Sequence, residues 1–167
     1  RMINARLESA AEKPSFRKAW RQRRCLVPAT HFYEWPRVGA RKQPTAITAM
    51  ANEPGAEGAV VALAFAGLWE SGHGELESFT ILTTEADDVM RPIHDRMPLI
   101  LPRDRWAQWL DPDWPVPGDP AGMREWLAPS RADPIRAYPV TSLVNAPRNE
   151  SRACLEPMPV QKPNIGL

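Results

Sequence analysis

The chain has 167 residues, a mass of 18.8 kDa and a composition that is 43% hydrophobic and 25% charged, which predicts one globular domain over residues 1–167. No apolar run approaches the roughly 20 residues that a membrane-spanning helix needs, and the first residues are not those of a secretion signal. Two cysteines, Cys25 and Cys154, are too few for a disulfide-built secreted scaffold, so a reducing cytoplasm is expected.

The charges are unevenly distributed along the sequence. Residues 1–42 hold eleven Lys and Arg against three acids, and residues 43–90 hold eight acids and no Lys or Arg. Of the 21 basic residues 17 are arginine, the side chain best shaped for bidentate phosphate contacts. A nucleic-acid-binding surface and ordinary solvated faces both account for this pattern, so charge alone does not decide between them.

The first half of the chain is predicted to hold a short helix followed by strands. Residues 13–24 have proline near their start, one apolar face and one basic face, which is typical of an amphipathic helix. Apolar and aromatic runs predict strands at 25–27, ending at Pro28, at 31–35, ending at Pro36, and at 45–50. A polar turn (37–43) and a loop (51–58) are expected between strands.

The second half continues the alternation of short strands and short helices. Strands are predicted at 59–69, with a bend at Gly67, and at 78–84, 97–101 and 137–140, with Val144 in a further closing strand. A turn at 71–74, a helical turn at 87–90 and helices at 104–110 and from 119 or 120 to 127 lie between them. Trp106, Trp109 and Leu110 are expected to point inward. This order predicts an α+β fold with a largely antiparallel sheet or barrel-like core and short flanking helices.

Two segments place polar side chains where strand chemistry does not call for them. In Phe32-Tyr33-Glu34-Trp35, alternation puts Glu34 on the face of Phe32 and opposite Trp35. A carboxylate among aromatic rings loses hydration, which favours its protonated form and suits it to proton transfer, although an edge strand with Glu34 in water is equally compatible with the pattern. In residues 91–98, two prolines flank His94 and Arg96, which could shuttle a proton and hold a phosphate, or form a salt-bridged turn without function.

Other site signatures are absent from the sequence. His31, His73 and His94 are far apart and the two cysteines do not form a CxxC pair, so neither a metal site nor a cofactor is expected. Cys25 lies inside an apolar run, where a buried, inert thiol is expected.

Motifs spread over almost the whole chain resemble, in order, those of the SRAP (SOS response-associated peptidase) family. The first half contributes Asn4-Ala5-Arg6, Pro14-Ser15-Phe16, Arg24–Ala29, Phe32-Tyr33-Glu34-Trp35 and Lys42-Gln43-Pro44. The second half contributes Phe65–Glu70, Phe79–Ala86, Ile93–Pro98, Val144-Asn145 and Cys154–Pro157. A series of this length in family order is far more specific than any one motif in it.

The resemblance implies a protein that senses abasic sites in single-stranded DNA and shields them by a covalent link. In the family, an N-terminal cysteine is exposed by self-removal of the initiator methionine, and its amine and thiol close a thiazolidine on the ring-opened sugar. An α-amine is partly unprotonated at neutral pH, which suits it to attack an aldehyde. Peptidase and lyase-type activity are the matching expectations. A monomer and a cytoplasmic, nucleoid-associated location are also expected, and the arginine-rich and proline-rich composition suggests a bacterial source.

Family roles carry over by motif to seven positions. Glu34 resembles the glutamate that transfers protons, His94 the histidine that assists opening of the sugar ring, and Asn4 the asparagine that positions the cysteine and the sugar. Arg6 and Arg96 match arginines that bind phosphate. Thr83 matches a polar neighbour of the site, and Trp35 an aromatic residue near the DNA bases.

The family nucleophile is not among the printed residues, because family members begin Met-Cys-Gly-Arg well before the Asn-Ala-Arg motif that here starts at Asn4. We therefore expect a longer native polypeptide to supply it. Two other interpretations stay open. One is a non-covalent binder of single-stranded DNA, and the other is a cysteine hydrolase that uses Cys25 or Cys154 with His94.

Overall fold

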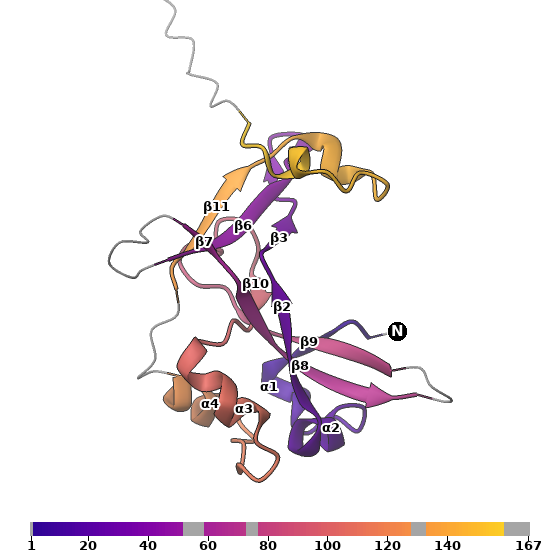
Figure 1. The fold of residues 1–167 in the computed structure, drawn as a ribbon, viewed down its shortest axis with the longest axis vertical. Coiled ribbons are helices and arrows are strands. Elements are labelled where there is room, and N and C mark those ends of the chain that lie inside the picture. Colours follow the sequence, from indigo (N-terminus) through magenta and orange to yellow (C-terminus); the bar gives the residue numbers. More distant parts are fainter. Residues whose placement is uncertain (1, 52–58, 73–76, 128–132, 159–167) are drawn as a thin grey trace, which may run out of the picture.

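Two β-sheets form the centre of the molecule, and short helices cover one of them (Figure 1). The structure is a computed structural model that describes residues 2–51, 59–72, 77–127 and 133–158. The predicted loop at 51–58 and the turn at 71–74, which includes His73, lie largely outside the described residues. Within them, no helix has the length and apolar character needed to cross a membrane.

The first sheet, sheet A, is built around two strands of nine residues each. Its order is β1 (Asn4–Arg6), β9 (Glu77–Glu85), β8 (Leu63–Ser71) and β2 (Arg24–Ala29), and β10 (Arg96–Pro98) also pairs with β9. β1 runs parallel to β9, and the other pairs are antiparallel. The predicted α+β fold with mostly antiparallel sheets is therefore confirmed, and the sheets of the described residues do not close into a barrel.

The second sheet, sheet B, has the order β11 (Ile135–Pro139), β6 (Thr45–Met50) and β3 (His31–Glu34), with β7 (Val60–Val61) also on β6. The strand predicted at 59–69 is in fact broken at Ala62, and Gly67 is not its bend. β7 pairs with β6 of sheet B, whereas β8 pairs with β2 and β9 of sheet A, so the chain passes from one sheet to the other at this residue. A small hairpin, β4 (Arg37–Val38) and β5 (Arg41–Lys42), turns at Gly39, which has a positive φ of 60°.

Four further predictions, three of secondary structure and one of burial, were wrong in detail. Pro28 does not end its strand, because β2 pairs with β8 on one side and the proline needs no donor on the other. Val144 lies in a 3₁₀ helix (Ser142–Asn145) and not in a strand, and Leu110 is exposed on the outer side of its helix. The helix predicted from residue 13 begins at Arg17.

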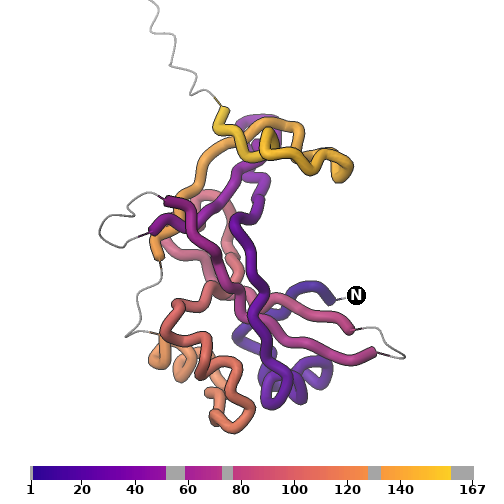
Figure 2. Tube along the Cα trace, in the orientation of Figure 1, coloured from indigo at the N-terminus to yellow at the C-terminus, as the bar shows by residue number. Residues whose placement is uncertain are grey.

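Among the described residues, four α-helices and a 3₁₀ helix cover one face of sheet A. These are α1 (Leu7–Ala10), α2 (Arg17–Gln22), a 3₁₀ helix (Arg103–Arg105), α3 (Trp106–Leu110) and α4 (Pro120–Leu127). Trp20, Trp109 and Met123 from the helices pack with Leu68 and Leu82 from the sheet in the largest core. Figure 2 shows the same grouping along the chain trace, with this helical layer gathered below the sheets. A last 3₁₀ helix (Arg152–Leu155) lies next to the one at Ser142–Asn145.

The opposite face of sheet A packs against sheet B. Phe65 from β8 and Phe32 from β3 meet edge to face, with ring centroids 5.7 Å apart. Ala49 and Leu63 are buried beside them, and Val27 and Ile81 pack on the same cluster. Aromatic pairs of this geometry stabilise a packed core beyond their buried area. The contact fixes how β3 sits over sheet A.

A buried arginine ties the helical layer to sheet A. The Arg24 side chain is only 6% exposed, and its guanidinium donates to the carbonyl oxygens of Trp20, Arg21, Trp109 and Asp111. It also lies over the rings of Trp109 and Trp114. Burial lowers the pKa of Arg24 from its ordinary value, and the nearby Asp111 opposes this shift. The carbonyl groups offset the loss of water, so the charge is stable where it lies.

We expect Arg24→Lys to lower the free energy of unfolding by about 2–3 kcal/mol, because one ammonium group cannot reach all the carbonyl oxygens and leaves some of them buried without a donor. Urea denaturation followed by tryptophan fluorescence measures the loss. Arg21→Lys is the matched control, since the side chain of Arg21 is exposed. Equal midpoints for the two variants would contradict the role given to Arg24.

Candidate functional site

Strand register places four of the predicted site residues on one face of sheet A. Asn4 lies opposite Ile81 and Arg6 opposite Thr83 in the parallel pair, and Pro98 lies opposite Thr83 in the antiparallel pair. Paired residues of neighbouring strands point to the same face, as do alternate residues of one strand. Asn4, Arg6, Thr83 and Arg96 therefore share a face, which we call the site face. Ala5 and Leu82 point to the helix-covered side, where both are buried.

The guanidinium of Arg96 is the most strongly bonded group of the site face. Nη1 donates to Oε1 of Glu8 over 2.7 Å and Nη2 to Oε2 over 2.9 Å. Nη2 also donates to the backbone oxygen of Thr83 over 2.6 Å and lies 3.2 Å from its Oγ1. The hydrogen bonds from Arg96 hold the pKa of Glu8 below its ordinary value, against partial burial, which raises it.

A hydrogen-bonded turn that begins at Asp87 places His94 next to Arg96. Oδ1 of Asp87 accepts from the amides of Val89 and Met90. The amide of His94 donates to the Met90 oxygen over 2.9 Å, and the amide of Ala86 donates to the Asp95 oxygen over 3.0 Å. The side chain of Met90 is fully buried, so the turn is anchored at its centre. The predicted helical turn at 87–90 is present as this hydrogen-bonded turn.

The imidazole of His94 has one nitrogen between a donor and an acceptor. Nδ1 lies 2.9 Å from the backbone nitrogen of Arg96, which donates to it, and 2.9 Å from Oδ1 of Asp95. A single nitrogen cannot accept from the amide and donate to the carboxylate in the same protonation state. The neutral ring that accepts from Arg96 carries its proton on Nε2, whereas donation to Asp95 requires a proton on Nδ1, in the other neutral tautomer or in the doubly protonated ring.

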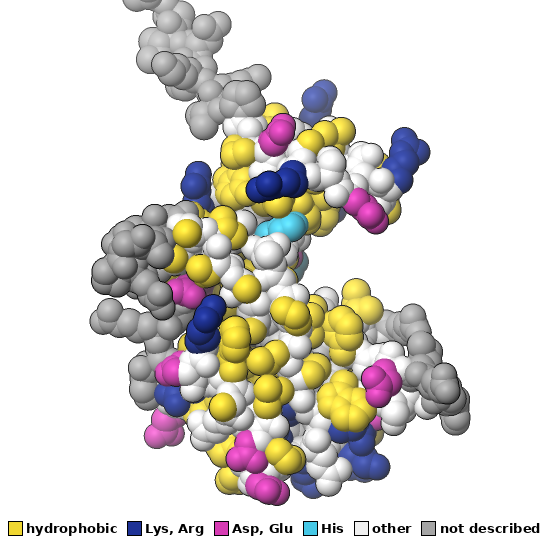
Figure 3. All heavy atoms as spheres, viewed as in Figure 1, with side chains coloured by type: hydrophobic (Ala, Val, Ile, Leu, Met, Phe, Trp, Pro, Cys, Tyr) yellow, Lys and Arg dark blue, Asp and Glu magenta, His cyan; other side chains and the backbone are white. Residues whose placement is uncertain are grey.

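Glu34 stands on the same side of sheet A as the site face. It follows Phe32 by two residues on β3, so both side chains share the face of β3 that packs on Phe65. Phe32 and Ile93, the residue before His94, also pack on one buried cluster with Met90 and Ile47. Figure 3 shows the surface hollowed between the part that carries β3 and the part that carries β9 and the first described residues. Glu34 and the His94 turn are thus connected through their neighbours Phe32 and Ile93, which pack on the same cluster.

Trp35 lies on the other side of β3 from Glu34. Its Nε1 donates to Oδ1 of Asn145 over 2.7 Å, and its ring centroid is 6.2 Å from that of Tyr33. The hydroxyl of Tyr33 in turn donates to the backbone oxygen of Cys154. This face of β3 therefore packs on the C-terminal 3₁₀ helices. Trp35 keeps 37% of its surface exposed.

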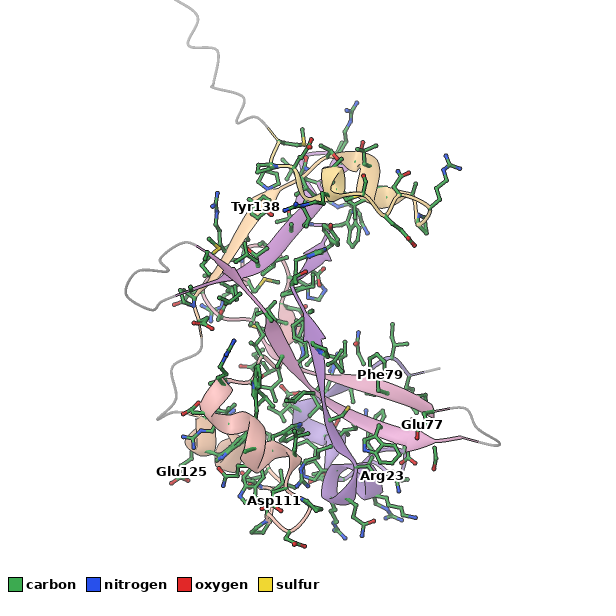
Figure 4. All side chains as sticks on the ribbon, viewed as in Figure 1. Arg23, Glu77, Phe79, Asp111, Glu125 and Tyr138 are labelled. Atoms are coloured by element: carbon green, nitrogen blue, oxygen red, sulfur yellow. The ribbon has the colours of Figure 1, made fainter. Side chains whose placement is uncertain are left out.

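An apolar groove of about 620 Å³ runs beside Asn4 along the first half of β9. Met2, Ile3 and Phe79 line it, and each of these side chains is more than half exposed. Phe79 and Glu77 stand at the free end of the β8–β9 hairpin (Figure 4). No role was predicted for Phe79 from the sequence, although its place in an alternating strand gives a ring on the site face.

The basic residues of the N-terminal region do not gather at the site. Arg17, Lys18 and Arg21 are exposed on α2, whose Ala19 and Trp20 pack on the helix-covered side of sheet A. At the site itself, Arg6 is exposed and Arg96 is neutralised by Glu8. The basic residues of α2 thus belong to the solvated side of the helical layer and not to the site face.

Neither cysteine is placed as a nucleophile beside His94. Burial raises the pKa of the Cys25 thiol, which faces Gly67 across the β2–β8 pair. Cys154 is buried in its 3₁₀ helix, and its Sγ lies 3.5 Å from the oxygen of Asn149. The cysteine hydrolase alternative is not favoured. Within the described ranges, no three His, Cys, Asp or Glu side chains lie close enough together to hold a metal ion.

Two contacts of the site were missed by sequence reasoning. Glu8 binds Arg96, although the two are 88 residues apart and no periodicity links them. The only signal for Glu8 was its place two residues after Arg6. Asp95 was seen as part of a polar turn, and its shared contact on Nδ1 of His94 required coordinates.

Comparison with known proteins shows that the chain is similar to members of one family. A family model for "SOS response associated peptidase (SRAP)" matches residues 1–147. The chain is 41% identical over 161 residues to the "Abasic site processing protein YoqW" of Bacillus subtilis, covering 93% of this chain and 67% of that protein. It is 33% identical over 168 residues to the "Abasic site processing protein HMCES" of Xenopus tropicalis, covering 91% of this chain and 49% of that protein.

A solved structure shares the architecture. A crystal structure of a protein from Bacteroides thetaiotaomicron matches with a TM-score of 0.72 and 26% identity, over 94% of this chain and 66% of that one. The chain thus spans about two thirds of the Bacillus and Bacteroides proteins and about half of the Xenopus protein.

The thiol of Cys25 is expected to react slowly with iodoacetamide at neutral pH, because its raised pKa moves the reactive thiolate to a higher pH than that of an ordinary cysteine. Peptide mass spectrometry after timed alkylation gives the rate at Cys25 as a function of pH, with free cysteine as the reference. A rate at pH 7 equal to or above that of free cysteine would return Cys25 to the candidate nucleophiles.

Proposed function

The chain belongs to the SOS response associated peptidase (SRAP) family, and we propose that it recognises abasic sites in single-stranded DNA and becomes covalently linked to them. The observation that carries the proposal is the site face. Asn4, Arg6 and Thr83 are set in register beside the bonded pair of Arg96 and His94, and Glu34 shares the face of β3 that packs on sheet A.

The proposed link forms by condensation of an N-terminal cysteine with the open-chain sugar. The α-amine attacks the C1 aldehyde, and loss of one water gives an imine. The thiol sulfur then adds to the imine carbon while the nitrogen takes a proton, which closes a thiazolidine. Both nucleophiles belong to one residue, so the second step has a high effective concentration. The net reaction joins protein and DNA and releases one water molecule.

Two side chains of this chain are proposed to move the protons. The sugar of an abasic site is mostly a closed ring, and opening it breaks the C1–O4 bond, adds a proton to O4 and removes the proton of the C1 hydroxyl. The Nε2–H of His94 suits the transfer to O4, since Nδ1 is occupied by the Arg96 amide, and the same Nε2 then takes the proton that the C1 hydroxyl loses. Glu34 suits the exchange of protons with the amine and the departing water, because no described residue bonds its carboxylate. Asn4 is proposed to hold the cysteine and the open sugar by its side-chain amide.

The DNA contacts are proposed to be phosphate bonds and stacking. Arg6 is exposed on the site face and is the main candidate for a phosphate contact. Arg96 has a smaller share, because Glu8 takes one bond from each of its terminal nitrogens, and Thr83 lies between the two arginines. Trp35 and Phe79 offer partly exposed aromatic rings for bases. A missing base leaves the sugar accessible between its neighbours.

The finer expectations of the family resemblance are part of the proposal. They are self-removal of the initiator methionine, lyase-type activity, a monomeric state and a nucleoid-associated location in a bacterial cytoplasm. The second candidate is a protein that binds the same DNA without a covalent step, and the exposed Arg6 and Phe79 would serve that function equally well.

Denaturing intact-mass spectrometry tests the proposal directly. The native polypeptide is incubated with a single-stranded oligonucleotide that carries one abasic site. We expect an adduct whose mass is the sum of the two components less one water. An oligonucleotide with a tetrahydrofuran analogue, which has no aldehyde, should bind in a gel-shift assay but give no adduct. Binding of both oligonucleotides without any adduct would exclude the covalent function and favour the non-covalent binder.

Glu34→Gln should slow adduct formation by about 10²-fold or more while DNA affinity stays the same, because the amide keeps the shape of the side chain but cannot accept a proton. Quenched time courses on denaturing gels give the rate, and fluorescence anisotropy with the tetrahydrofuran oligonucleotide gives the affinity. Glu125→Gln is the control of equal charge change, since Glu125 lies on α4 in the helical layer (Figure 4). A rate for Glu34→Gln equal to that of the control would remove Glu34 from the mechanism.

A further inference from the structure

We propose that Glu8 is a positioning residue that acts through Arg96 to hold His94 as the tautomer with its proton on Nε2, an inference whose catalytic meaning rests on the proposed function. Neither the sequence motifs nor the family name assigns a role to Glu8. Three observations carry the inference: the hydrogen bonds of the Arg96 guanidinium, the burial of the Arg96 side chain, and the hydrogen bond from the Arg96 backbone to His94.

Arg96 directs most of its donors at the protein itself. A guanidinium has five N–H groups. The Glu8 carboxylate accepts one from Nη1 and one from Nη2, and the backbone oxygen of Thr83 accepts the second from Nη2. Nε is buried and has no partner among the described residues. The charge of the guanidinium is therefore matched by Glu8.

The contact with Glu8 keeps the Arg96 guanidinium from turning away toward water. A buried Nε–H without an acceptor is unfavourable, so the guanidinium gains by turning toward water unless other bonds hold it. The bidentate contact with Glu8 supplies that hold. The side chain of Arg96 keeps only 19% of its surface exposed, against 35% for Glu8. The pair thus fixes Arg96 at the surface end of β10.

The backbone of Arg96 connects this pair to His94. The same residue whose side chain is held by Glu8 donates its backbone N–H to Nδ1 of His94 over 2.9 Å. Asp95 competes for that nitrogen at an equal distance, and it favours a proton on Nδ1. The position of the Arg96 backbone decides which contact prevails. With Arg96 fixed, Nδ1 accepts and Nε2 carries the proton.

Glu8 itself is held by its place in the chain. It lies in α1, directly after β1, between Leu7 and Ala10, which are both buried against sheet A. Because β1 and β10 both pair with β9, α1 and Arg96 are carried by neighbouring strands. The carboxylate therefore reaches the guanidinium from a rigid base, as an effective positioning group must.

The experiment is a long-range ¹H–¹⁵N NMR spectrum of the histidine rings, recorded at a pH where imidazole is neutral, with His94 assigned by its loss in His94→Gln. In the unmodified protein we expect the pattern of a ring protonated on Nε2. In Glu8→Gln we expect a mixture of both tautomers. The matched control is Glu12→Gln, because Glu12 is an exposed acid of the same segment. Glu8→Asp, which keeps the charge on a shorter side chain, should restore the Nε2 form in part.

Adduct formation provides the second measurement. Glu8→Gln should slow the reaction with abasic DNA about tenfold and leave affinity for the tetrahydrofuran oligonucleotide within about twofold, because a tautomer affects proton transfer and not phosphate contact. Thermal unfolding of each variant confirms that the fold is retained.

The outcomes separate the two proposals. A ring protonated on Nδ1 in the unmodified protein, or identical spectra for Glu8→Gln and Glu12→Gln, would overturn the role of Glu8. If Glu8→Gln does not fold, the Glu8→Asp spectrum decides by the same criterion. If neither the unmodified protein nor any variant forms an adduct, the covalent function fails, and the spectra still show whether Glu8 sets the tautomer.

Discussion

The geometry of the site depends on the backbone hydrogen bonding of one strand, β9. It pairs with β1 along one edge and with β8 and then β10 along the other, so three other strands share its register. A slip of one residue in any of these pairs would move a site residue to the helix-covered face. The buried Leu82 prevents such a slip, because its side chain must stay in the core. The burial of Leu82 in the core therefore determines which residues of sheet A point to the site face.

Local patterns predicted much of the fold, and long-range contacts account for the rest. The strand at Thr45–Met50 and the helix at Pro120–Leu127 were predicted because their apolar periodicity and end signals agree. The break at Ala62 could not be, since the apolar run continues through it and only pairing with two sheets divides it. Motif resemblance identified the site residues. It could not identify Glu8 as the partner of Arg96, because their contact arises only when β1 and β10 both pair with β9.

Two arginines show how one kind of side chain serves two purposes. Arg24 is buried and donates to backbone oxygens, so its bonds join helices to a strand and depend little on other side chains. Arg96 donates mainly to a carboxylate and one backbone oxygen, so its orientation depends on a single neighbour. The first arrangement suits a structural link, and the second can be altered by one substitution. In both, the planar fork makes the geometry specific.

Pro28 has a consequence for how the molecule behaves in a crowded solution. In the described part of the chain, β8 is the one strand that pairs with β2, and the other edge of β2 has no strand partner, so a foreign strand could extend it. Proline at that edge removes one backbone donor that an added strand would need. Exposed edges are the usual starting points of aggregation, and natural sheets often protect them with such residues. Pro28, which was predicted to end the strand, thus makes self-association through this edge less favourable.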